Sequence, residues 1–263
     1  NKLFHPASNL KLLTTAAALH ILDNNYDFRT LFYSDSIYEG GTVLNGKLCV
    51  NGLGDPLFDE SDLDSVVRLI QRAGINTING DIVGDVSCFD SLSWGSGWMW
   101  DDEPDPDEAF ISPLTINNNT IQFTVYPGKK EQFPPFIEIV PATNVVPVVN
   151  MGITSSDTSF PPLTVTRLPN DDKIIIRGRI SQSEQKKTFG ISIRKPELFF
   201  LQLFKERLEK NGIAVKGTTF LESLISRQSL AELQHGIGWP KLFISFHHSL
   251  DSVIYYCNKE SNN

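Results

Sequence analysis

The chain has 263 residues, 40% of them hydrophobic and 21% charged, which predicts a soluble globular protein with one large domain or a few small ones. A formal net charge of −8 argues against nucleic acids and anionic membranes as main partners. No apolar run approaches the roughly 20 residues that cross a bilayer, and Cys49, Cys88 and Cys257 are too scattered for a disulfide framework or a zinc site, so we expect buried thiols.

A serine and a lysine stand three residues apart near the start of the chain. Ser8 and Lys11 precede residues 14–22, which are rich in helix formers and contain no Gly or Pro, and Pro6 suits a first helical turn. Positions i and i+3 share a helix face, so the hydroxyl and the amine are predicted to meet, as in a nucleophile with its own base. A serine at a helix start is more often a cap, and the pair alone leaves both interpretations open. Because the chain opens within this pattern, we expect an incomplete N-terminus.

Residues 27–85 are predicted to alternate between strands and a helix, the order of a mixed α/β unit. Strands are expected at residues 28–33, 42–51 and 75–85, and an amphipathic helix runs from acidic residues 59–60 to Gly74. The glycine-rich residues 52–56 lack the lysine and further glycines of a phosphate loop, so they predict a structural turn.

A tryptophan-rich stretch follows at residues 94–102 and leads into the acidic, proline-broken residues 103–108. It contains three of the four tryptophans in the chain. One interpretation is a solvated loop that packed indoles anchor, and the other is a binding ledge whose carboxylates receive a cationic part of a substrate. The two interpretations are compatible.

The second half of the chain is predicted to be β-rich and then to return to α/β structure. Short segments of β-branched and aromatic residues predict a small sandwich or barrel without a catalytic constellation, with strands at residues 120–126, 136–140, 145–149, 163–168, 173–180 and 189–193. A helix at residues 196–211, a strand at 213–221 and a helix at 250–257 come next, and residues 222–241 give no clear pattern.

The chain ends on Ser261-Asn262-Asn263, which has the form S-x-N. Ser8-x-x-Lys11 and S-x-N are two of the three motifs of serine β-lactamases and penicillin-binding proteins. Further segments add to the match through their order and spacing: residues 6–22, 46–48, 54–56, 78–81, 97–102, 211–213, 248–250 and 259–263. Together they resemble the low-molecular-mass class C penicillin-binding proteins, which are D-alanyl-D-alanine carboxypeptidases and endopeptidases.

The resemblance implies an α+β multi-domain fold in which a penicillin-binding, β-lactamase/transpeptidase-like α-β-α domain carries nested insertions. We expect the peptidase domain to comprise residues 1–26 and 245–263. Residues 27–112 and 194–244 are then an inserted α/β domain, and residues 113–193 are a β-rich domain nested within it. The predicted order of α/β, β-rich and again α/β elements fits this nesting.

The resemblance also implies roles for the first motif. Ser8 is expected to attack the carbonyl carbon of a D-Ala-D-Ala bond through its Oγ, forming an acyl-enzyme that water hydrolyses. Lys11, as a neutral amine, is expected to take the hydroxyl proton. Leu10, Leu12 and Leu13 are expected to give this amine apolar surroundings.

The second motif is expected to complete the proton path. Ser261 relays a proton to the leaving amine, and Asn263 holds the substrate amide and orients Lys11. The backbone N–H of Ser8 supplies one oxyanion donor. No cofactor and no metal ion is required.

The tryptophan-rich stretch is expected, by the same resemblance, to recognise the free end of a peptidoglycan stem peptide through Trp98, Trp100, Asp102 and Phe110. Asp102→Ala is then expected to weaken hydrolysis of substrates with a free amino group more than that of simple D-Ala-D-Ala peptides. β-Lactam antibiotics are the expected acylating inhibitors, and the expected location is the periplasm or another extracytoplasmic space. The resemblance leaves self-association and the balance of carboxypeptidase and endopeptidase activity open.

The third family motif, K-[ST]-G, is absent from this sequence. The nearest match, Lys187-Thr188-Phe189-Gly190, has an extra residue and precedes the S-x-N motif. We therefore expect a copy truncated after the second motif that is not a competent enzyme alone. Two alternatives stay open: a catalytically incomplete relative that binds peptidoglycan, and an unrelated α/β binding protein with chance motifs.

Overall fold

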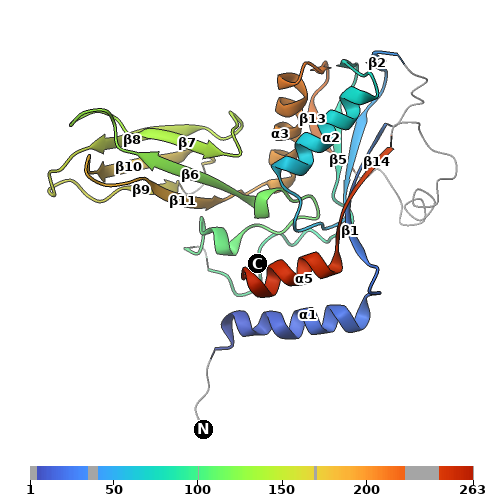
Figure 1. Cartoon of the computed structure of the whole chain (residues 1–263), viewed down its shortest axis with the longest axis horizontal. Coiled ribbons are helices and arrows are strands. Elements are labelled where there is room, and N and C mark those ends of the chain that lie inside the picture. Colours follow the sequence, from blue (N-terminus) through green and yellow to red (C-terminus); the bar gives the residue numbers. More distant parts are fainter. Residues whose placement is uncertain (1–4, 35–40, 100, 169–170, 223–242, 263) are drawn as a thin grey trace, which may run out of the picture.

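The structure is a computed structural model that describes residues 5–34, 41–99, 101–168, 171–222 and 243–262. Its helices and strands form three regions, which Figure 1 shows: a central sheet with two helices beside it, a β-rich extension, and a pair of helices below the sheet. The mixed architecture confirms the predicted α+β fold class. No helix or strand is predicted for residues 222–241, and all of them except Glu222 lie outside the described residues.

The central sheet joins segments from both ends of the chain. Its strands lie in the order β13 (Thr219–Leu221), β5 (Ile82–Asp85), β3 (Leu48–Gly52), β1 (Asp27–Ser34) and β14 (Phe243–Ser249). The first three strands run parallel to one another, whereas β1 is antiparallel to both β3 and β14. Strand β14 was not predicted, and its pairing with β1 brings the last described residues back to the start of the chain.

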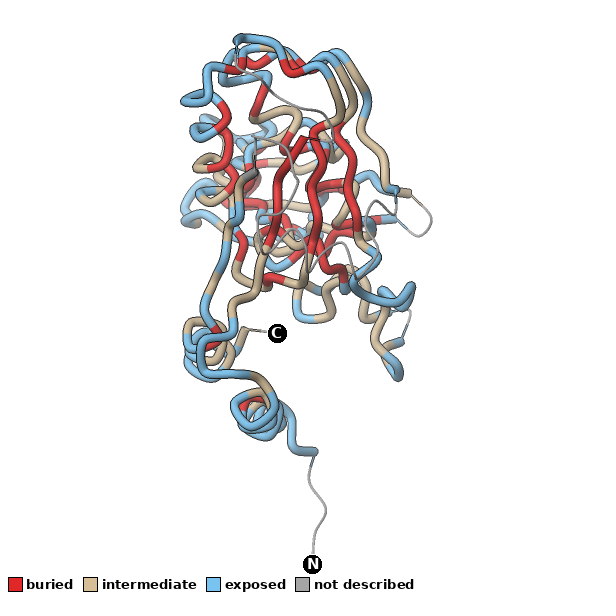
Figure 2. Tube along the Cα trace, turned by 90° about the vertical axis from the view of Figure 1, so that its right-hand side faces the viewer, coloured by how far each residue is buried: buried red, intermediate tan, exposed pale blue. Residues whose placement is uncertain are grey.

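Two helices, α2 (Glu60–Arg72) and α3 (Pro196–Lys210), cover one face of this sheet (Figure 1). Their apolar sides bury four phenylalanines against the strands: Phe32, Phe58, Phe200 and Phe204. The ring centroids of Phe32 and Phe204 are 5.4 Å apart in an edge-on arrangement, which aromatic pairs favour. Figure 2 shows that buried residues concentrate in this central sheet.

Three predicted strands are each split in two, and in these cases the prediction of single strands was wrong. Residues 42–51, 75–85 and 213–221 pass from a small sheet of β2 (Val43–Leu44), β4 (Thr77–Ile78) and β12 (Ala214–Val215) into the central sheet. The breaks fall at Gly46, Gly80 and Gly217, whose backbones touch: a Cβ on Gly80 would overlap the Gly46 carbonyl, and one on Gly217 would overlap the Gly80 carbonyl. Glycine is therefore required for the chains to cross so closely.

The β-rich extension consists of two three-stranded sheets, in the orders β11-β6-β7 and β8-β10-β9. The strands are β6 (Thr120–Tyr126), β7 (Phe136–Val140), β8 (Val148–Thr154), β9 (Thr164–Arg167), β10 (Ile174–Ile180) and β11 (Lys187–Ser192). They confirm the predicted β-rich region, although β8 starts three residues late because Pro147 has no N–H for the ladder. Their apolar residues are continuous with the core around α3.

Below the sheet, helix α1 (Leu10–Ile21) follows a short 3₁₀ turn, η1 (Ala7–Asn9), and packs against α5 (Leu250–Lys259). Figure 2 shows this pair as mostly exposed. Leu12 is 59% and Leu13 is 69% exposed, so the expected apolar surroundings of the lysine on α1 were wrong: the leucines occupy a face that α5 does not cover. In the ranges given above, no helix is both long and apolar enough to span a membrane.

The cysteine prediction holds for one residue of three. Cys49 is buried in β3, whereas Cys88 is exposed on the loop after β5 and Cys257 is partly buried on α5. Cys88 lies in a turn after β5, and Cys257 lies on α5, which is mostly exposed. Neither cysteine therefore has the packing from several sides that a buried position needs.

Candidate active site

The two terminal motifs meet in space. Ser8 Oγ lies 3.1 Å from Ser261 Oγ, although 253 residues separate them in the sequence. Lys11 Nζ donates to the Ser261 carbonyl oxygen at 2.6 Å and to Ser261 Oγ at 3.1 Å. Ser261 Oγ is thus within hydrogen-bonding distance of both the candidate nucleophile and the candidate base. Asn263 lies outside the described residues.

Two consecutive hydrogen bonds link α1 to α5 close to Ser8, Lys11 and Ser261. Thr15, one turn after Lys11, donates from Oγ1 to the Lys11 carbonyl oxygen at 2.8 Å. Asn258 Nδ2 donates to Thr15 Oγ1 at 3.1 Å. Sequence reasoning missed Thr15 and Asn258, although Thr15 stands four residues after Lys11 and so on the same face of α1. Thr15 is the one residue of α1 that is buried.

The backbone turns sharply at Ser261. Its φ of +55° lies in the left-handed region, which often ends a helix. The N–H groups of Glu260 and Asn262 both donate to the Tyr256 carbonyl oxygen, at 3.1 and 3.3 Å. The Asn262 side chain then donates to Asn118 Oδ1 at 3.3 Å, so the end of α5 is tied to the loop before β6.

A pocket of about 820 Å³ opens beside the two motifs. Ser8 and Lys11 line it together with Trp98, Phe110 and Phe89. The structure therefore brings two of the four predicted recognition residues, Trp98 and Phe110, to the same cavity as the candidate nucleophile. Trp100 lies outside the described residues.

The aromatic wall is a packed cluster. The Trp94 ring lies 4.9 Å from Trp98, edge-on, and 4.7 Å from Phe110. Gly95 leaves room for the Trp98 indole, because a Cβ there would lie 2.7 Å from the ring. Similarly, Gly54 has a φ of +81° and faces Phe89, and a Cβ would lie 2.8 Å from that ring. The indoles of Trp94 and Trp98 pack together, as the first interpretation predicts, and Trp98 also borders the cavity. The interpretation as a binding ledge stays a prediction.

The acidic residues line two neighbouring hollows, and Glu108 borders both. Asp107 and Glu108, on the 3₁₀ turn η2 (Pro106–Glu108), line the pocket that contains Ser8. Asp102 lines a neighbouring hollow instead, and its Oδ2 accepts the Met99 N–H at 2.6 Å. Partial burial, together with the nearby Asp105, Asp102 and Asp107 carboxylates, raises the pKa of Glu108. Asp107 and Glu108 belong to the acidic run of the binding-ledge interpretation, which does not single them out among its carboxylates.

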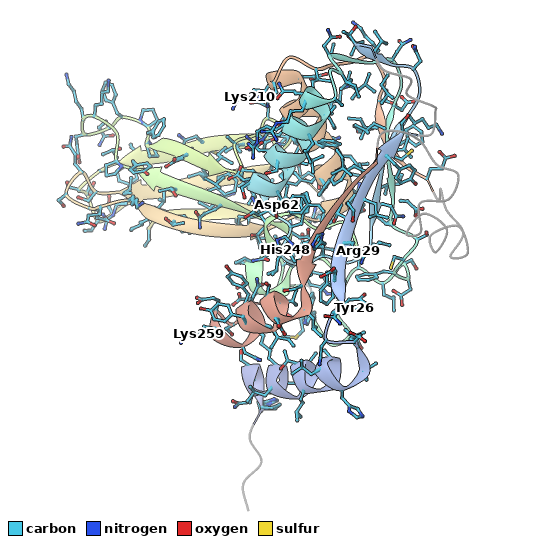
Figure 3. The ribbon with its side chains drawn as sticks, turned by 45° about the vertical axis from the view of Figure 1, so that its right-hand side comes forward. Tyr26, Arg29, Asp62, Lys210, His248 and Lys259 are labelled. Atoms are coloured by element: carbon cyan, nitrogen blue, oxygen red, sulfur yellow. The ribbon has the colours of Figure 1, made fainter. Side chains whose placement is uncertain are left out.

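A contact between Asp55 and His248 ties the glycine-rich turn to the end of β14. Asp55 Oδ2 lies 2.9 Å from His248 Nδ1, and Asp62 Oδ2 lies 3.7 Å from His248 Nε2. Figure 3 shows His248 at the end of β14, below Asp62 on α2. Burial raises the pKa of Asp55 more than His248 lowers it. The interpretation of residues 52–56 as a structural turn stays a prediction, and Gly54 and Pro56 also line the pocket that contains Ser8.

The near-match to the third motif has a definite place in the fold. The near-match Lys187-Thr188-Phe189-Gly190 lies on β11 and pairs with β6, far along the chain from either motif. Among the residues that the structure describes, no group of three or more His, Cys, Asp or Glu side chains is arranged to hold a metal ion.

Comparison with known proteins identifies the family. A model described as the D-Ala-D-Ala carboxypeptidase 3 (S13) family matches residues 1–235. The chain is 30% identical over 218 residues to the D-alanyl-D-alanine carboxypeptidase of Actinomadura sp. (strain R39), and 28% identical over 222 residues to DacB of Haemophilus influenzae. These matches cover 81% and 82% of the chain but only 40% and 45% of the relatives.

Solved structures show the same fold. Penicillin-binding protein 4 (dacB) from Haemophilus influenzae superposes with a TM-score of 0.78 at 23% identity, covering 99% of this chain and 55% of that one. The same protein in complex with a β-lactam gives a TM-score of 0.68 at 21% identity, covering 98% and 53%. These structures confirm the fold, and the family model with the relatives confirms the resemblance noted from the motifs. The chain belongs to the D-Ala-D-Ala carboxypeptidase 3 (S13) family.

Proposed function

We propose that this chain supplies the nucleophile and the base of a serine peptidase that cleaves D-Ala-D-Ala bonds in peptidoglycan through an acyl-enzyme. One observation carries the proposal: Ser261 Oγ lies 3.1 Å from both Ser8 Oγ and Lys11 Nζ. A hydroxyl between a hydroxyl and an amine forms a continuous path for a proton. Family membership supports the same activity.

The geometry favours a relayed rather than a direct proton transfer. As Ser8 Oγ bonds to the substrate carbonyl carbon, its proton passes to Ser261 Oγ, and the Ser261 proton passes to a neutral Lys11. Collapse of the tetrahedral intermediate breaks the peptide bond, and the proton returns through Ser261 to the leaving amine. Water then hydrolyses the ester on Ser8. Asn263 is assigned to the substrate amide, and the backbone N–H of Ser8 to the oxyanion.

The pocket suits a peptide with a cationic end. Trp98 and Phe110 provide apolar walls, and Asp107 and Glu108 provide negative charge in the same cavity. Trp100 and Asp102 are proposed to assist from the adjoining residues. The cavity has room for more than a dipeptide, which supports endopeptidase cleavage of cross-links as well as carboxypeptidase cleavage. A peptidoglycan substrate places the protein in the periplasm or another extracytoplasmic space, which cell fractionation tests.

Covalent labelling with a fluorescent penicillin tests the proposal. In the natural protein we expect an adduct that mass spectrometry assigns to Ser8, that Ser8→Ala abolishes and that the control Ser159→Ala leaves unchanged. An adduct on any other residue contradicts the assignment, and so does complete absence of labelling. We expect the 263-residue chain alone, which lacks K-[ST]-G, to form no stable adduct.

A second candidate function is binding without cleavage, in the pocket to which Asp107 and Glu108 give negative charge. A catalytically incomplete relative could use the same pocket to bind peptidoglycan without cleaving it. In that case purified peptidoglycan retains the natural protein in a pull-down assay, and penicillin forms no adduct. Retention that Glu108→Gln weakens, in the absence of any acylation, supports the binding function over the peptidase.

A further inference from the structure

We propose that Glu103 is a positioning residue whose ion pairs with Arg167 and Arg194 fix the acidic segment, residues 101–110, against the β-rich sheets. Through this segment the three side chains, here called the Glu103 clamp, set the specificity of the pocket for a cationic substrate. The specificity part rests on the proposed function, whereas the positioning part does not.

The clamp joins parts of the chain that belong to different regions. Glu103 precedes η2, Arg167 ends β9, and Arg194 follows β11. Arg167 donates to Glu103 Oε1 from Nε at 3.1 Å and also from Nη2. Arg194 donates from Nε to Oε1 at 2.5 Å and from Nη2 to Oε2 at 3.2 Å. One carboxylate thus receives four N–H groups from two guanidinium groups, the fork geometry that makes arginine pairs strong and directional.

Burial limits the access of water to these hydrogen bonds. The Arg167 side chain is 5% exposed and that of Glu103 is 20% exposed, so water cannot easily replace either partner. Burial raises the pKa of Glu103, but the hydrogen bonds and charges of Arg194 and Arg167 outweigh it and hold that pKa below its usual range. The carboxylate is therefore ionised at neutral pH.

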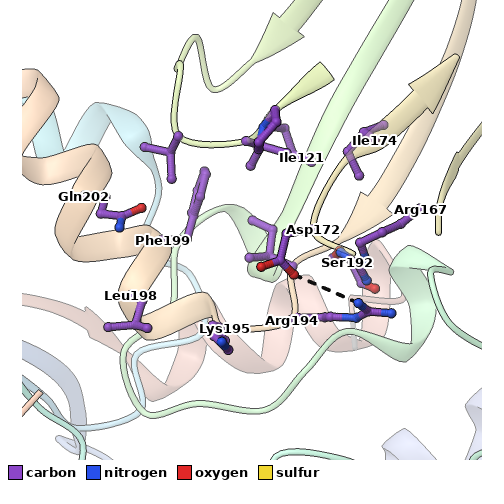
Figure 4. A pocket seen from close by; sticks show the side chains of 14 residues that line it. Ile121, Arg167, Asp172, Ile174, Ser192, Arg194, Lys195, Leu198, Phe199 and Gln202 are labelled. Carbon is purple, nitrogen blue, oxygen red and sulfur yellow. Dashed lines mark hydrogen bonds and ion pairs between the residues drawn. The ribbon is translucent and has the colours of Figure 1, made fainter. Parts of the chain in front are cut away.

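Arg167 and Arg194 interact only weakly with acidic side chains other than Glu103. Figure 4 shows Arg167 and Arg194 at one end of a cavity of about 260 Å³, with Asp172 across from Arg194. Asp172 Oδ1 is 4.0 Å from Arg194 Nη1, the edge of ion-pair range. The remaining partners are backbone carbonyl oxygens, those of Ser192 at 2.5 Å and Asp171 at 3.1 Å. Glu103 is thus the main charged partner of both guanidinium groups.

The acidic segment also contacts β11 between the Glu103 clamp and the pocket. The Pro104 carbonyl oxygen accepts the Ser192 N–H at 3.0 Å, which adds a bond to β11. Pro106 packs on Gly190 of the same strand, where a Cβ would lie 3.0 Å from the ring. Glu108 and Phe110 follow directly and line the pocket. A shift of the segment at Glu103 is therefore transmitted to the residues that face the substrate.

Hydrogen exchange tests the positioning part without any need for activity. In Glu103→Gln we expect amide exchange to speed up by about tenfold or more at Asp102, Asp105 and Ser192, whose N–H groups are bonded in this segment or to it. The strands β6 and β10 are expected to keep their protection. Glu138→Gln is the matched control, because Glu138 bonds Tyr126 in the same sheets and does not contact the segment.

Two further variants guard against loss of the fold. Arg194→Gln leaves the Glu103–Arg167 pair intact and is expected to give a smaller increase in exchange. Glu103→Asp keeps the charge with a shorter reach and is expected to restore part of the protection. If all three variants exchange like the Glu138→Gln control, the clamp does not position the segment.

Substrate choice tests the specificity part. With peptides that differ only in a free or an acetylated amino group, we expect Glu103→Gln to reduce the wild-type preference in kcat/KM for the free amine by about tenfold, mainly through KM. Acylation by a penicillin without an amine is expected to change little. An unchanged preference despite faster exchange overturns the specificity part. Absence of cleavage and acylation in the wild type refutes the proposed function instead, and exchange still decides the positioning.

Discussion

At the scale of single residues, the contacts of Ser261 make it the most informative position of the site. It touches both Ser8 and Lys11 through one hydroxyl. We expect Ser261→Ala to slow acylation by penicillin by about 10²-fold or more, because the proton path loses its middle member. Stopped-flow labelling measures the rate, with Ser159→Ala as a distant control. Equal rates in the two variants contradict a relay.

The raised pKa of Glu108 gives a pH prediction. A cationic substrate group needs the ionised carboxylate, and partial burial with three neighbouring carboxylates makes that form harder to reach. We therefore expect the preference for amine-bearing peptides to rise with pH through a midpoint above the ordinary value for glutamate. Glu108→Gln should remove this rise. A preference independent of pH in the wild type contradicts the role of Glu108.

The contrast between Asp102 and Glu108 can be measured directly. The sequence-based prediction gives Asp102→Ala a selective loss on amine-bearing peptides, whereas Asp102 lines a neighbouring hollow and bonds the Met99 N–H. We expect a selective loss from Asp102→Ala that is smaller than that from Glu108→Gln, because only Glu108 lines the pocket itself. Paired kcat/KM values for both peptides decide the order. Equal losses on both peptides contradict a recognition role for Asp102.

Spacing alone predicted that Ser8 and Lys11 share a helix face. The place of Ser261 beside them was expected only from the resemblance to the penicillin-binding proteins, because 253 residues separate the two motifs. Glu103 could not be found in this way. Its importance depends on two arginines more than sixty residues further along the chain, and nothing near Glu103 in the sequence indicates which sheet it contacts.

At the scale of elements, α2 begins with a complete capping box. The Asp59 side chain accepts the N–H groups of Ser61 and Asp62, and the Asp62 side chain accepts the Asp59 N–H at 3.0 Å. Asp59→Ala should lower the free energy of unfolding by about 1 kcal/mol, as removal of an N-cap usually does. Urea unfolding measures the change. The exposed Asp101→Ala is the control, and equal values for both variants contradict the cap.

Local patterns predicted some elements closely and failed at others for a clear reason. Strands β6 and β7 have the predicted bounds, and α2 and α3 follow their apolar periodicity and glycine stops. Strand β14 was missed because its partner β1 lies more than two hundred residues earlier. The split strands were missed because their breaks depend on contacts among glycines from three separate segments.

At the scale of the whole molecule, the glycine crossing joins the small sheet to the central one. Gly80→Ala should destabilise the protein by about 1–3 kcal/mol, since the added methyl group meets backbone atoms that cannot rotate away. Gly97→Ala is the comparison, because its Cβ has free space and only its φ of +92° is unfavourable. Thermal unfolding gives both values. A smaller loss for Gly80→Ala than for Gly97→Ala contradicts the steric argument.

The predicted sequence of regions agrees with the order of elements in the structure: α/β, then β-rich, then a returning helix and strands. The boundaries proposed for the nested domains remain predictions. Composition and turn spacing indicate whether a region is α/β or β-rich. The boundaries between regions depend on long-range contacts, such as the pairing of β1 with β14. Those contacts also bring the two terminal motifs together.

The pairing of β1 with β14 has a consequence for folding. Ser8 and Lys11 leave the ribosome early, but their partner Ser261 arrives 253 and 250 residues later and is delivered by the antiparallel register of that pair. Contacts of such high sequence separation form slowly and late. The candidate nucleophile is therefore expected to stay without its relay until the central sheet has closed.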